Sequence, residues 1–212
     1  MKAIRLRTNY LANPIGIDII KPCFTWNCEG GKIQSAYQIL CKDENGNVLW
    51  DSGKVLGHAM RAVYEGATLA SRTRVKVFVN LWDENDEPGE TSEACFEMGL
   101  LAAQDWKAKW ITGNIKVNKK NRYPVDCFRK TFCIPEGKTV KKARAYMTAC
   151  GLYEGTLNGS KIGRFCLAPG ITDYRKRIQY QTVDITEMIK NATPEEKQVL
   201  QQKIATLSTK IM

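Results

Sequence analysis

Apolar and polar residues alternate along short segments in the first half of the chain, which is the pattern of β-strands. Turn signals rich in glycine and proline separate these segments, for example at residues 29–31 and 88–89. Several short strands at roughly 8–12-residue spacing, without a helical period, are typical of a β-sandwich. The expected strands cover residues 23–28, 36–42, 47–50, 62–65, 74–82 and 94–98.

The same alternation indicates which side chains form the core of this first sandwich. Phe24 and Trp26 share one face of their strand, and apolar residues occupy every second position from Val75 to Val79. Large aromatic side chains on such faces usually pack in the interior. We therefore interpret Trp26 and Trp50 as core residues and not as platforms for stacking sugars.

The second half of the chain continues the β pattern. Asn158-Gly159 stands between two apolar segments, and this dipeptide is a strong signal for a two-residue hairpin. Residues 105–111 contain two tryptophans, Trp106 and Trp110, and are interpreted as the joint between two domains. The strands expected after this joint cover residues 128–134, 142–148, 153–157, 161–165 and 179–184.

A different period begins near the C-terminus. Thr193, Pro194 and Glu196 have the order of a helix N-cap, a first-turn proline and a capping-box glutamate. Apolar residues then recur at helical spacing: Leu200, Ile204, Leu207 and Ile211. The chain is therefore predicted to be all-β except for a short C-terminal α-helix, with domains at residues 1–104 and 105–190 and an amphipathic helix at residues 191–212.

Composition changes this picture little. The 43% of hydrophobic and 25% of charged residues are ordinary for a globular protein, and no apolar run of 18 residues predicts a membrane helix. The first 20 residues lack the apolar block of a signal peptide. Eight cysteines occur without a CxxC pair, so we expect free thiols, no metal site and a cytoplasmic location. Most of them lie in apolar strand-like segments, where a reduced cysteine behaves as a small core residue.

Charge is unevenly distributed along the chain. Residues 1–104 hold 11 Lys+Arg against 13 Asp+Glu, a net charge of −2, and residues 105–212 hold 21 against 9, a net charge of +12. The basic residues of the second half are dispersed over turns and strand ends, without a nucleic-acid-binding motif. A solvated basic surface is favoured over a specific nucleic-acid groove, and weak affinity for anionic polymers follows from either.

An ordered series of motifs links the chain to a known family. The first half contains NPIGID, PCFTW, AYQI, LWDSGKV, YEGATLASRT, LWDEN and FEMGLL, followed by DWKAKWI. The second half contains ARAYMTACGLYEGTLNGSKIG and LAPGITDYRKRIQYQTVDIT. Over roughly residues 8–190 the chain resembles bacterial α-L-rhamnosidases (glycoside hydrolase family 78-like). The resemblance implies a fibronectin-III-like domain followed by an incomplete jelly-roll-like N-terminal domain, which together give two tandem β-sandwiches.

The resemblance also suggests a site. A related module in some family members binds terminal rhamnose with the help of calcium, and residues here that would play such a part are Glu154, Asn158, Asp173 and Tyr174. Carboxylate and amide oxygens suit both a hard cation and sugar hydroxyls. The alternative is purely structural: Asn158-Gly159 forms a turn, and Asp173 and Tyr174 close a loop. No other cofactor is expected.

Catalytic residues are not expected in this chain. Inverting glycosidases need a general acid and a general base on opposite sides of the scissile bond, and the resembled family keeps this pair in a later (α/α)₆ barrel. His58 is the one histidine, and no nucleophile motif accompanies it. The acidic run at residues 83–90 is interpreted as a solvated hairpin connection, because Pro88-Gly89 interrupts any calcium-ligand spacing.

Three functions compete on these grounds. We favour a non-catalytic N-terminal accessory fragment of an α-L-rhamnosidase; the alternatives are a free-standing rhamnose-binding module and a structural subunit for a separately encoded catalytic domain. A jelly roll without its later strands leaves an open edge. We expect the C-terminal helix or a second copy of the chain to cover that edge, and we expect neither a specific nucleic acid nor a membrane as partner.

Overall fold

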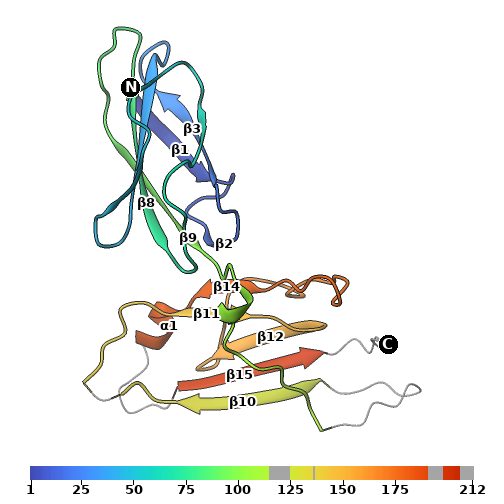
Figure 1. The fold of residues 1–212 in the computed structure, drawn as a ribbon. Helices are drawn as coiled ribbons and strands as arrows, with labels where there is room; N and C mark the ends of the chain where they lie inside the picture. Colours follow the sequence, from blue (N-terminus) through green and yellow to red (C-terminus); the bar gives the residue numbers. More distant parts are fainter. Residues whose placement is uncertain (115–124, 136, 191–197, 206–212) are drawn as a thin grey trace. The chain divides into compact units, whose positions relative to one another are not determined.

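The computed structural model describes residues 1–114, 125–135, 137–190 and 198–205 of the chain. The fold is nearly all β, and the chain divides into two compact units, Met1–Lys107 and Ala108–Met212 (Figure 1). Each unit packs antiparallel sheets around apolar side chains, as expected for two β-sandwich domains in series.

The first unit has two sheets. A three-stranded sheet has the order β1-β3-β7, and a six-stranded sheet has the order β2-β9-β8-β4-β5, with β6 paired to β4 as its sixth strand. All of these pairs are antiparallel except β2 with β9. The strands are β1 (Lys2–Thr8), β2 (Ile15–Ile17), β3 (Cys23–Glu29), β4 (Ala36–Lys42), β5 (Val48–Asp51), β6 (Val55–Leu56), β7 (Arg61–Val63), β8 (Arg74–Trp82) and β9 (Ser92–Met98).

Aromatic side chains fill the space between the two sheets. The ring of Phe24 lies 5.9 Å from that of Phe96 and 6.3 Å from that of Trp50, measured between centroids. Trp26 is buried, and its indole Nε1–H donates a 2.9 Å hydrogen bond to Gln34 Oε1. Buried indoles need such a partner for their one polar group. The prediction that Trp26 and Trp50 belong to the core is confirmed.

The acidic run of the first unit is a hairpin connection between β8 and β9. The Asp83 carboxylate accepts hydrogen bonds from the backbone N–H groups of Asn85, at 2.9 Å, and Glu87, at 3.1 Å. Asp86 has a φ of +62°, which aspartate tolerates in tight turns. The carboxylate thus closes the turn through local hydrogen bonds, as its sequence position indicated.

A short 3₁₀ turn, η1 (Ala103–Asp105), ends the first unit. The Asp105 carboxylate accepts hydrogen bonds from the Ser71 hydroxyl and from the Ala102 N–H, the latter at 3.1 Å. Arg72 Nη2 donates to the Asp105 carbonyl oxygen at 2.9 Å. The Ser71 hydrogen bond is the main cause that lowers the pKa of Asp105. These contacts fix the end of the first unit to the loop that precedes β8.

The second unit also contains two sheets. A four-stranded sheet has the order β10-β15-β12-β13, and a two-stranded sheet pairs β11 with β14. Its elements are β10 (Asp126–Phe132), β11 (Arg144–Met147), β12 (Leu152–Leu157), β13 (Ser160–Lys161), β14 (Gln181–Asp184), α1 (Thr186–Lys190) and β15 (Gln198–Ala205). The expected Asn158-Gly159 hairpin joins β12 to β13, with a φ of +50° at Asn158 and +79° at Gly159.

The predicted C-terminal helix is wrong for the part that the structure describes. Gln198–Ala205 forms β15, which lies between β10 and β12 and pairs antiparallel with both. A spacing of four residues places Leu200 and Ile204 on one face of a strand as well as of a helix, so the pattern was ambiguous. The pairing on both sides satisfies the backbone of β15 itself, while β10 remains an edge strand that is paired on one side. The expected cap at 193–196 and the positions 207 and 211 lie outside the described residues.

The expectation that the C-terminal helix covers the open edge is corrected in the same way, and its alternative, a second copy of the chain, stays a prediction. The chain itself supplies a strand, because β15 bridges β10 and β12 through seven and six paired residues respectively. The α-helix within the described ranges is α1, which is only five residues long. It packs against the core of the second unit through Ile189. Strand pairing, and not helix packing, therefore completes the four-stranded sheet.

Among the residues whose burial the structure describes, the core of the second unit centres on three side chains. Leu157, Ile162 and Ile189 are buried, and partly buried apolar residues surround them: Phe132, Ile134, Val140, Ala143, Ala145, Met147, Val183, Ile185 and Met188. Across the two-stranded sheet, Arg144 pairs with Asp184 at 2.9 Å while its own side chain is 8% exposed. This pair closes one end of the sheet.

All eight cysteines are free thiols, but their burial differs from the expectation. Most of them were predicted to behave as small core residues, yet only Cys41 is buried. Burial raises the pKa of the Cys41 thiol to about 12. Cys133, expected within a strand, is exposed just after β10. In the described residues, no helix combines the length and apolarity that crossing a membrane requires.

Candidate functional site

A long irregular loop between β13 and β14 is the most distinctive surface of the second unit. It covers residues 162–180 and is drawn in orange beside β14 in Figure 1. Its base is buried at Ala168 and Pro169, which are joined by a cis peptide bond. The backbone N–H of Tyr153 in β12 donates a 2.8 Å hydrogen bond to the Ala168 carbonyl. The loop is thereby tied to the four-stranded sheet.

A second set of contacts ties the loop to β14. Gln181 Nε2 donates to the Pro169 carbonyl at 3.1 Å, and the Tyr153 hydroxyl donates to Gln181 Oε1 at 3.0 Å. Burial raises the pKa of Tyr153 to about 12, so its hydroxyl keeps the proton that this hydrogen bond needs. The amide of Gln181 is therefore held from both sides, and it connects the loop base to both sheets of the unit.

The far part of the loop is closed by Asp173. Its carbonyl oxygen accepts hydrogen bonds from the N–H groups of Lys176, at 2.8 Å, and Arg177, at 2.9 Å. Its carboxylate accepts from the backbone N–H and the guanidinium of Arg175, the latter at 3.1 Å. Thr172 Oγ1 donates to the Arg177 carbonyl at 2.5 Å. This is a self-contained turn of the kind that aspartate stabilises.

The loop presents apolar side chains to solvent. Phe165 is 47% exposed, Leu167 73% and Ile171 72%. Leu167 also has a φ of +53°, a left-handed conformation that costs a branched residue energy. Around these three stand the exposed basic side chains of the loop: Arg164, Arg175, Lys176 and Arg177. We call these seven residues the apolar–basic loop.

Sequence reasoning missed this surface. Phe165 was expected at the end of a strand at residues 161–165, and Leu167 and Ile171 were noted only as members of the motif LAPGITDYRKRIQYQTVDIT. Which apolar residue faces solvent depends on the path of an irregular loop, and no periodicity encodes that path. The dense basic residues at 175–177 were the available signal.

Two of the four sequence-predicted sugar-binding residues lie on the β12–β13 hairpin. Glu154 belongs to β12, and its carboxylate forms a 3.2 Å ion pair with Lys161 of β13. Asn158 is the first residue of the two-residue turn and is exposed. The structural interpretation of Asn158-Gly159 as a turn agrees with this position.

The other two predicted residues lie in the loop turn described above. The Asp173 carboxylate is engaged by Arg175, and the Tyr174 hydroxyl is buried without a hydrogen-bond partner among the described residues. The ion pairs of Glu154 and Asp173 thus stay within two different segments. Within the described ranges, no three His, Cys, Asp or Glu side chains gather as metal ligands would. The sugar-binding assignment stays a prediction.

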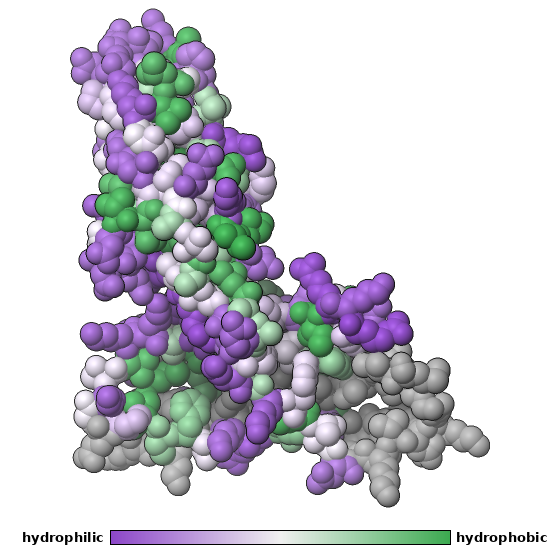
Figure 2. All heavy atoms as spheres, viewed as in Figure 1, coloured by the Kyte–Doolittle hydropathy of each residue, from purple (hydrophilic) through white to green (hydrophobic). Residues whose placement is uncertain are grey.

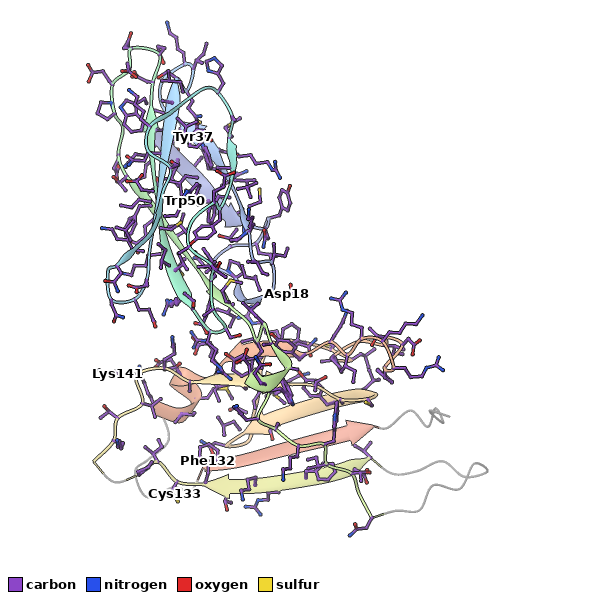
Figure 3. The ribbon with its side chains drawn as sticks, viewed as in Figure 1. Asp18, Tyr37, Trp50, Phe132, Cys133 and Lys141 are labelled. Atoms are coloured by element: carbon purple, nitrogen blue, oxygen red, sulfur yellow. The ribbon has the colours of Figure 1, made fainter. Side chains whose placement is uncertain are left out.

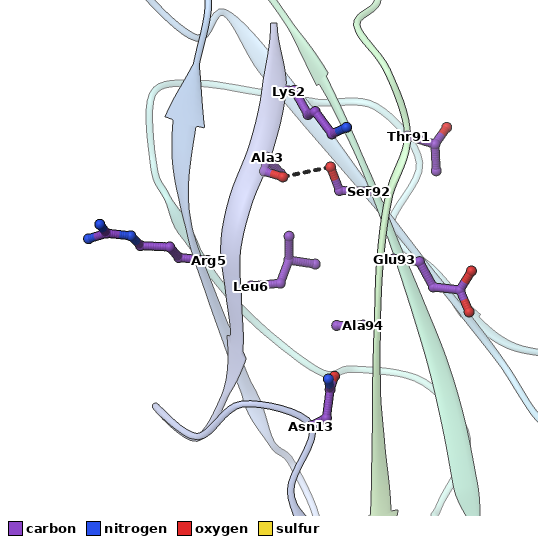
Figure 4. A pocket seen from close by; sticks show the side chains of 9 residues that line it. All are labelled: Lys2, Ala3, Arg5, Leu6, Asn13, Thr91, Ser92, Glu93 and Ala94. Carbon is purple, nitrogen blue, oxygen red and sulfur yellow. Dashed lines mark hydrogen bonds between the residues drawn. The ribbon is translucent and has the colours of Figure 1, made fainter.

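The first unit has one depression worth describing. It lies where the edge of β1 faces the start of β9, has a volume of about 300 Å³, and is lined by residues such as Leu6, Asn13 and Glu93 (Figure 4). The Ser92 hydroxyl donates to the Ala3 carbonyl at 2.6 Å and bridges the two strands across it. The lining is that of a gap between two sheet edges.

Paired acids are not found in the interior of the part of the chain that the structure describes. Among the described residues, Glu97 is the buried carboxylate, at 1% exposure, and no second buried carboxylate faces it. An acid–base pair of the inverting type needs two carboxyl groups roughly 6.5–9.5 Å apart across a sugar-sized pocket. The arrangement seen here is therefore that of a β-sandwich scaffold with an exposed loop. It defines a class of tandem β-sandwich domains.

Comparison with known families identifies which domains these are. Residues 3–102 match the model "Rha78A-like, N-terminal immunoglobulin domain", and residues 138–197 match "Alpha-L-rhamnosidase N-terminal domain". The chain therefore matches the two N-terminal domains of α-L-rhamnosidases, as the motif series indicated.

Individual relatives agree. The chain is 35% identical over 195 residues to an α-L-rhamnosidase from Formosa agariphila, covering 84% of this chain but 21% of that protein. The structure of the α-L-rhamnosidase from Dictyoglumus thermophilum matches 97% of this chain and 25% of its own, with a TM-score of 0.80 and 32% identity. An Aspergillus terreus enzyme shares the fold, with a TM-score of 0.81 and 22% identity. The chain thus spans about a fifth to a quarter of these relatives.

Proposed function

We propose that this chain serves as the non-catalytic N-terminal accessory part of an α-L-rhamnosidase, a family whose whole enzymes release terminal α-L-rhamnose from glycans. The proposal rests on the difference between the aligned fractions of the two sequences: 84% of this chain aligns with only 21% of the Formosa agariphila protein. The chain therefore represents the accessory quarter of such an enzyme. Its role is to supply a rigid β-scaffold.

The chemistry of the described residues supports this role. The exposed carboxylates are engaged in turns and ion pairs, such as Asp83 with two backbone N–H groups and Asp173 with Arg175. Glu97 is buried in the first unit, away from the one depression described there. A general acid needs both a sugar pocket and a facing base. A scaffold needs neither of them.

A turnover assay tests the proposal directly. The purified chain is incubated with an aryl α-L-rhamnoside, and release of the phenol is followed against a buffer blank and against an intact α-L-rhamnosidase. We expect no turnover above the blank. Turnover that survives repurification and is lost in Glu97→Gln would contradict the non-catalytic role, because Glu97 is the buried carboxylate among the described residues.

A second candidate function is binding of terminal rhamnose with calcium. It is favoured by the exposure of Glu154 and Asp173, whose side chains are 54% and 38% exposed and offer carboxylate oxygens to a ligand. Asn158 would add hydrogen bonds to sugar hydroxyls, whereas the Tyr174 hydroxyl is buried and would have to become accessible before it could do so. Calorimetric titration with L-rhamnose, with and without calcium, tests this function. The absence of binding heat at millimolar sugar would rule out this binding function. Binding heat that disappears in the double variant Glu154→Gln with Asp173→Asn would support it.

A cytoplasmic location is part of the same proposal. It is supported by the eight free thiols, of which Cys127, Cys133 and Cys166 are exposed. Exposed thiols stay reduced in the cytosol and oxidise outside it. Cell fractionation together with thiol labelling checks this point, and recovery of the chain with oxidised cysteines in the periplasm or medium would contradict it.

A further inference from the structure

We propose that the apolar–basic loop is the surface on which these accessory domains dock against the catalytic part of an α-L-rhamnosidase. This inference rests on the proposed function and specifies the surface. The surface of the catalytic part that contacts the loop should have an apolar pocket for Phe165, Leu167 and Ile171, with acidic residues around it. The loop is otherwise a costly feature, since it exposes apolar area and strains its backbone.

Exposure of the apolar residues is the first argument. Leu167 and Ile171 are both more than 70% exposed, and Phe165 is 47% exposed, within a stretch of seven residues. Leu167 carries two free-energy costs: its backbone has a φ of +53°, and its apolar side chain is exposed to water. Clusters of exposed apolar residues in soluble proteins mark interaction sites. A partner surface would remove this apolar area from water.

Charge is the second argument. The loop at residues 162–180 carries four Lys+Arg and one Asp, and the second half of the chain has a net charge of +12. Asp173 is already engaged by Arg175. A partner surface that approaches the loop therefore meets an excess of positive charge around an apolar centre. Acidic side chains on the partner would complement this positive charge. Arginine around an apolar centre is also typical of protein interfaces.

The type of apolar residue favours a protein over a glycan or nucleic acid. Sugars and bases stack on flat aromatic faces. Two of the three exposed apolar residues here, Leu167 and Ile171, are aliphatic and branched. Figure 2 shows hydrophobic side chains beside hydrophilic ones on this part of the second unit. Such a mixture suits an apolar pocket with an acidic rim.

Preorganisation is the third argument. The base of the loop is buried at Ala168 and Pro169, Gln181 holds the Pro169 carbonyl, and Asp173 closes the far turn. Additional support comes from the Thr148 hydroxyl, which donates to the Gln179 carbonyl at 2.5 Å. A loop held in this way loses little conformational entropy when it binds. Its exposed side chains are presented in one arrangement.

Trypsin provides the test, because it cleaves after the lysine and arginines of the loop. A chimera is made in which this chain replaces the matching segment of the Formosa agariphila α-L-rhamnosidase. We expect cleavage at residues 175–177 to be rapid in the isolated chain and slower by about tenfold or more in the chimera, since cleavage tracks the undocked population. Cleavage after Lys32, an exposed residue of the first unit, should be equal in both.

Variants separate docking from other causes. Leu167→Asp with Ile171→Asp should restore rapid cleavage in the chimera. Arg175→Gln with Arg177→Gln should do the same at the remaining Lys176. The matched control is Leu56→Asp, which changes an exposed residue of the first unit, at 78% exposure, and should leave the protection intact. In the isolated chain all these variants should melt within about 2 °C of the wild type, as exposed substitutions do.

The outcomes distinguish the inference from the proposed function. A chimera without rhamnosidase activity or a cooperative unfolding transition would count against the accessory role itself. An active chimera whose loop is cleaved as fast as in the isolated chain would overturn docking alone. Protection of the isolated chain by heparin, without protection in the chimera, would show a polyanion site instead. Concentration-dependent protection of the isolated chain would assign the loop to a second copy.

Discussion

The two units use the same antiparallel construction but close their cores to different degrees. In the first unit fifteen buried side chains form one cluster, which includes Phe24, Ile39 and Phe96. Among the described residues of the second unit, three do so. Residues as large as Phe132 and Met147 stay only partly buried there. Figure 3 shows how densely side chains fill the first unit around the labelled Tyr37 and Trp50.

Among the described residues, the first unit therefore has the larger apolar core, and the second unit leaves more of its large apolar side chains only partly buried. Stability of small domains depends on the apolar area that they bury. The second unit exposes Leu167 and Ile171 and carries most of the positive charge of the chain. Contacts outside the described residues are therefore expected at the second unit.

The largest effect is expected in the closed core. Phe96 is 1% exposed and packs against Phe24, so Phe96→Ala should destabilise the first unit by about 3–5 kcal/mol. Urea unfolding followed by tryptophan fluorescence measures this, because Trp26 and Trp50 report on the same core. Val48→Ala, at a residue that is 59% exposed, should change stability by less than about 0.5 kcal/mol. A loss below about 1 kcal/mol for Phe96→Ala would break the comparison.

A smaller loss is expected in the open core. Leu157 is 1% exposed, but its neighbours are only partly buried and can relax into the space that a truncation leaves. Leu157→Ala should therefore cost about 2–3 kcal/mol, at the low end for a leucine. Hydrogen exchange of the β12 amides measures it, with Val125→Ala, at 47% exposure, as the control. A cost equal to that of Phe96→Ala would show that the second core is as tightly packed as the first.

The end of the first unit should respond to pH. The pKa of Asp105 is lowered, chiefly by the Ser71 hydrogen bond, so the folded state favours the charged carboxylate. Its contribution is present above the ordinary pKa of 3.8 and is lost as pH falls below that value towards the folded pKa. Asp105→Asn should therefore flatten the acid limb of the stability curve of the first unit. Asp18→Asn, an exposed loop carboxylate, serves as control, and an unchanged acid limb in Asp105→Asn would contradict the assignment.

The smallest effect is expected on the β12–β13 hairpin. The ion pair of Glu154 and Lys161 is exposed, so Glu154→Gln should change the unfolding free energy by about 0.5 kcal/mol or less. Lys161→Gln should give a similar change, and the double variant should add little, because both remove one pair. Thermal unfolding measures all three. A loss well above 1 kcal/mol for Glu154→Gln would mean that the hairpin depends on this pair.

Much of the fold could be predicted from local patterns. The strands at residues 36–42 and 74–82 were expected at the bounds that the structure shows for β4 and β8. Both lie inside a sheet with one buried face, where apolar alternation is strongest. The Asn158-Gly159 hairpin was also correct, since its turn needs two residues with positive φ.

Edge strands and late strands were not predictable in the same way. β1 (Lys2–Thr8) was missed, because Arg5 interrupts the strand with a φ of +52° and the register shifts between Ile4 and Arg7. β15 was mistaken for a helix, because a four-residue apolar spacing suits either structure. Its strand character depends on β10 and β12, which are distant in the sequence.

The candidate site also combines features that the sequence could predict with features that only the structure shows. Glu154, Asn158, Asp173 and Tyr174 were selected by residue chemistry, and the structure places them on two segments, each with its own local contacts. The apolar–basic loop was selected by exposure, which the sequence does not record. The structure therefore adds a surface where residue types alone suggested a sugar site.

The sequence by itself determined that this is a tandem β protein with the N-terminal domains of an α-L-rhamnosidase. Alternation, turn residues and motif order are local properties, and each can be read without knowing what lies beside it. Only the tertiary structure decided that the chain uses β15 to join β10 and β12, and that Leu167 and Ile171 face solvent. Pairing and exposure are relations between distant segments, so their free energy appears only once those segments meet.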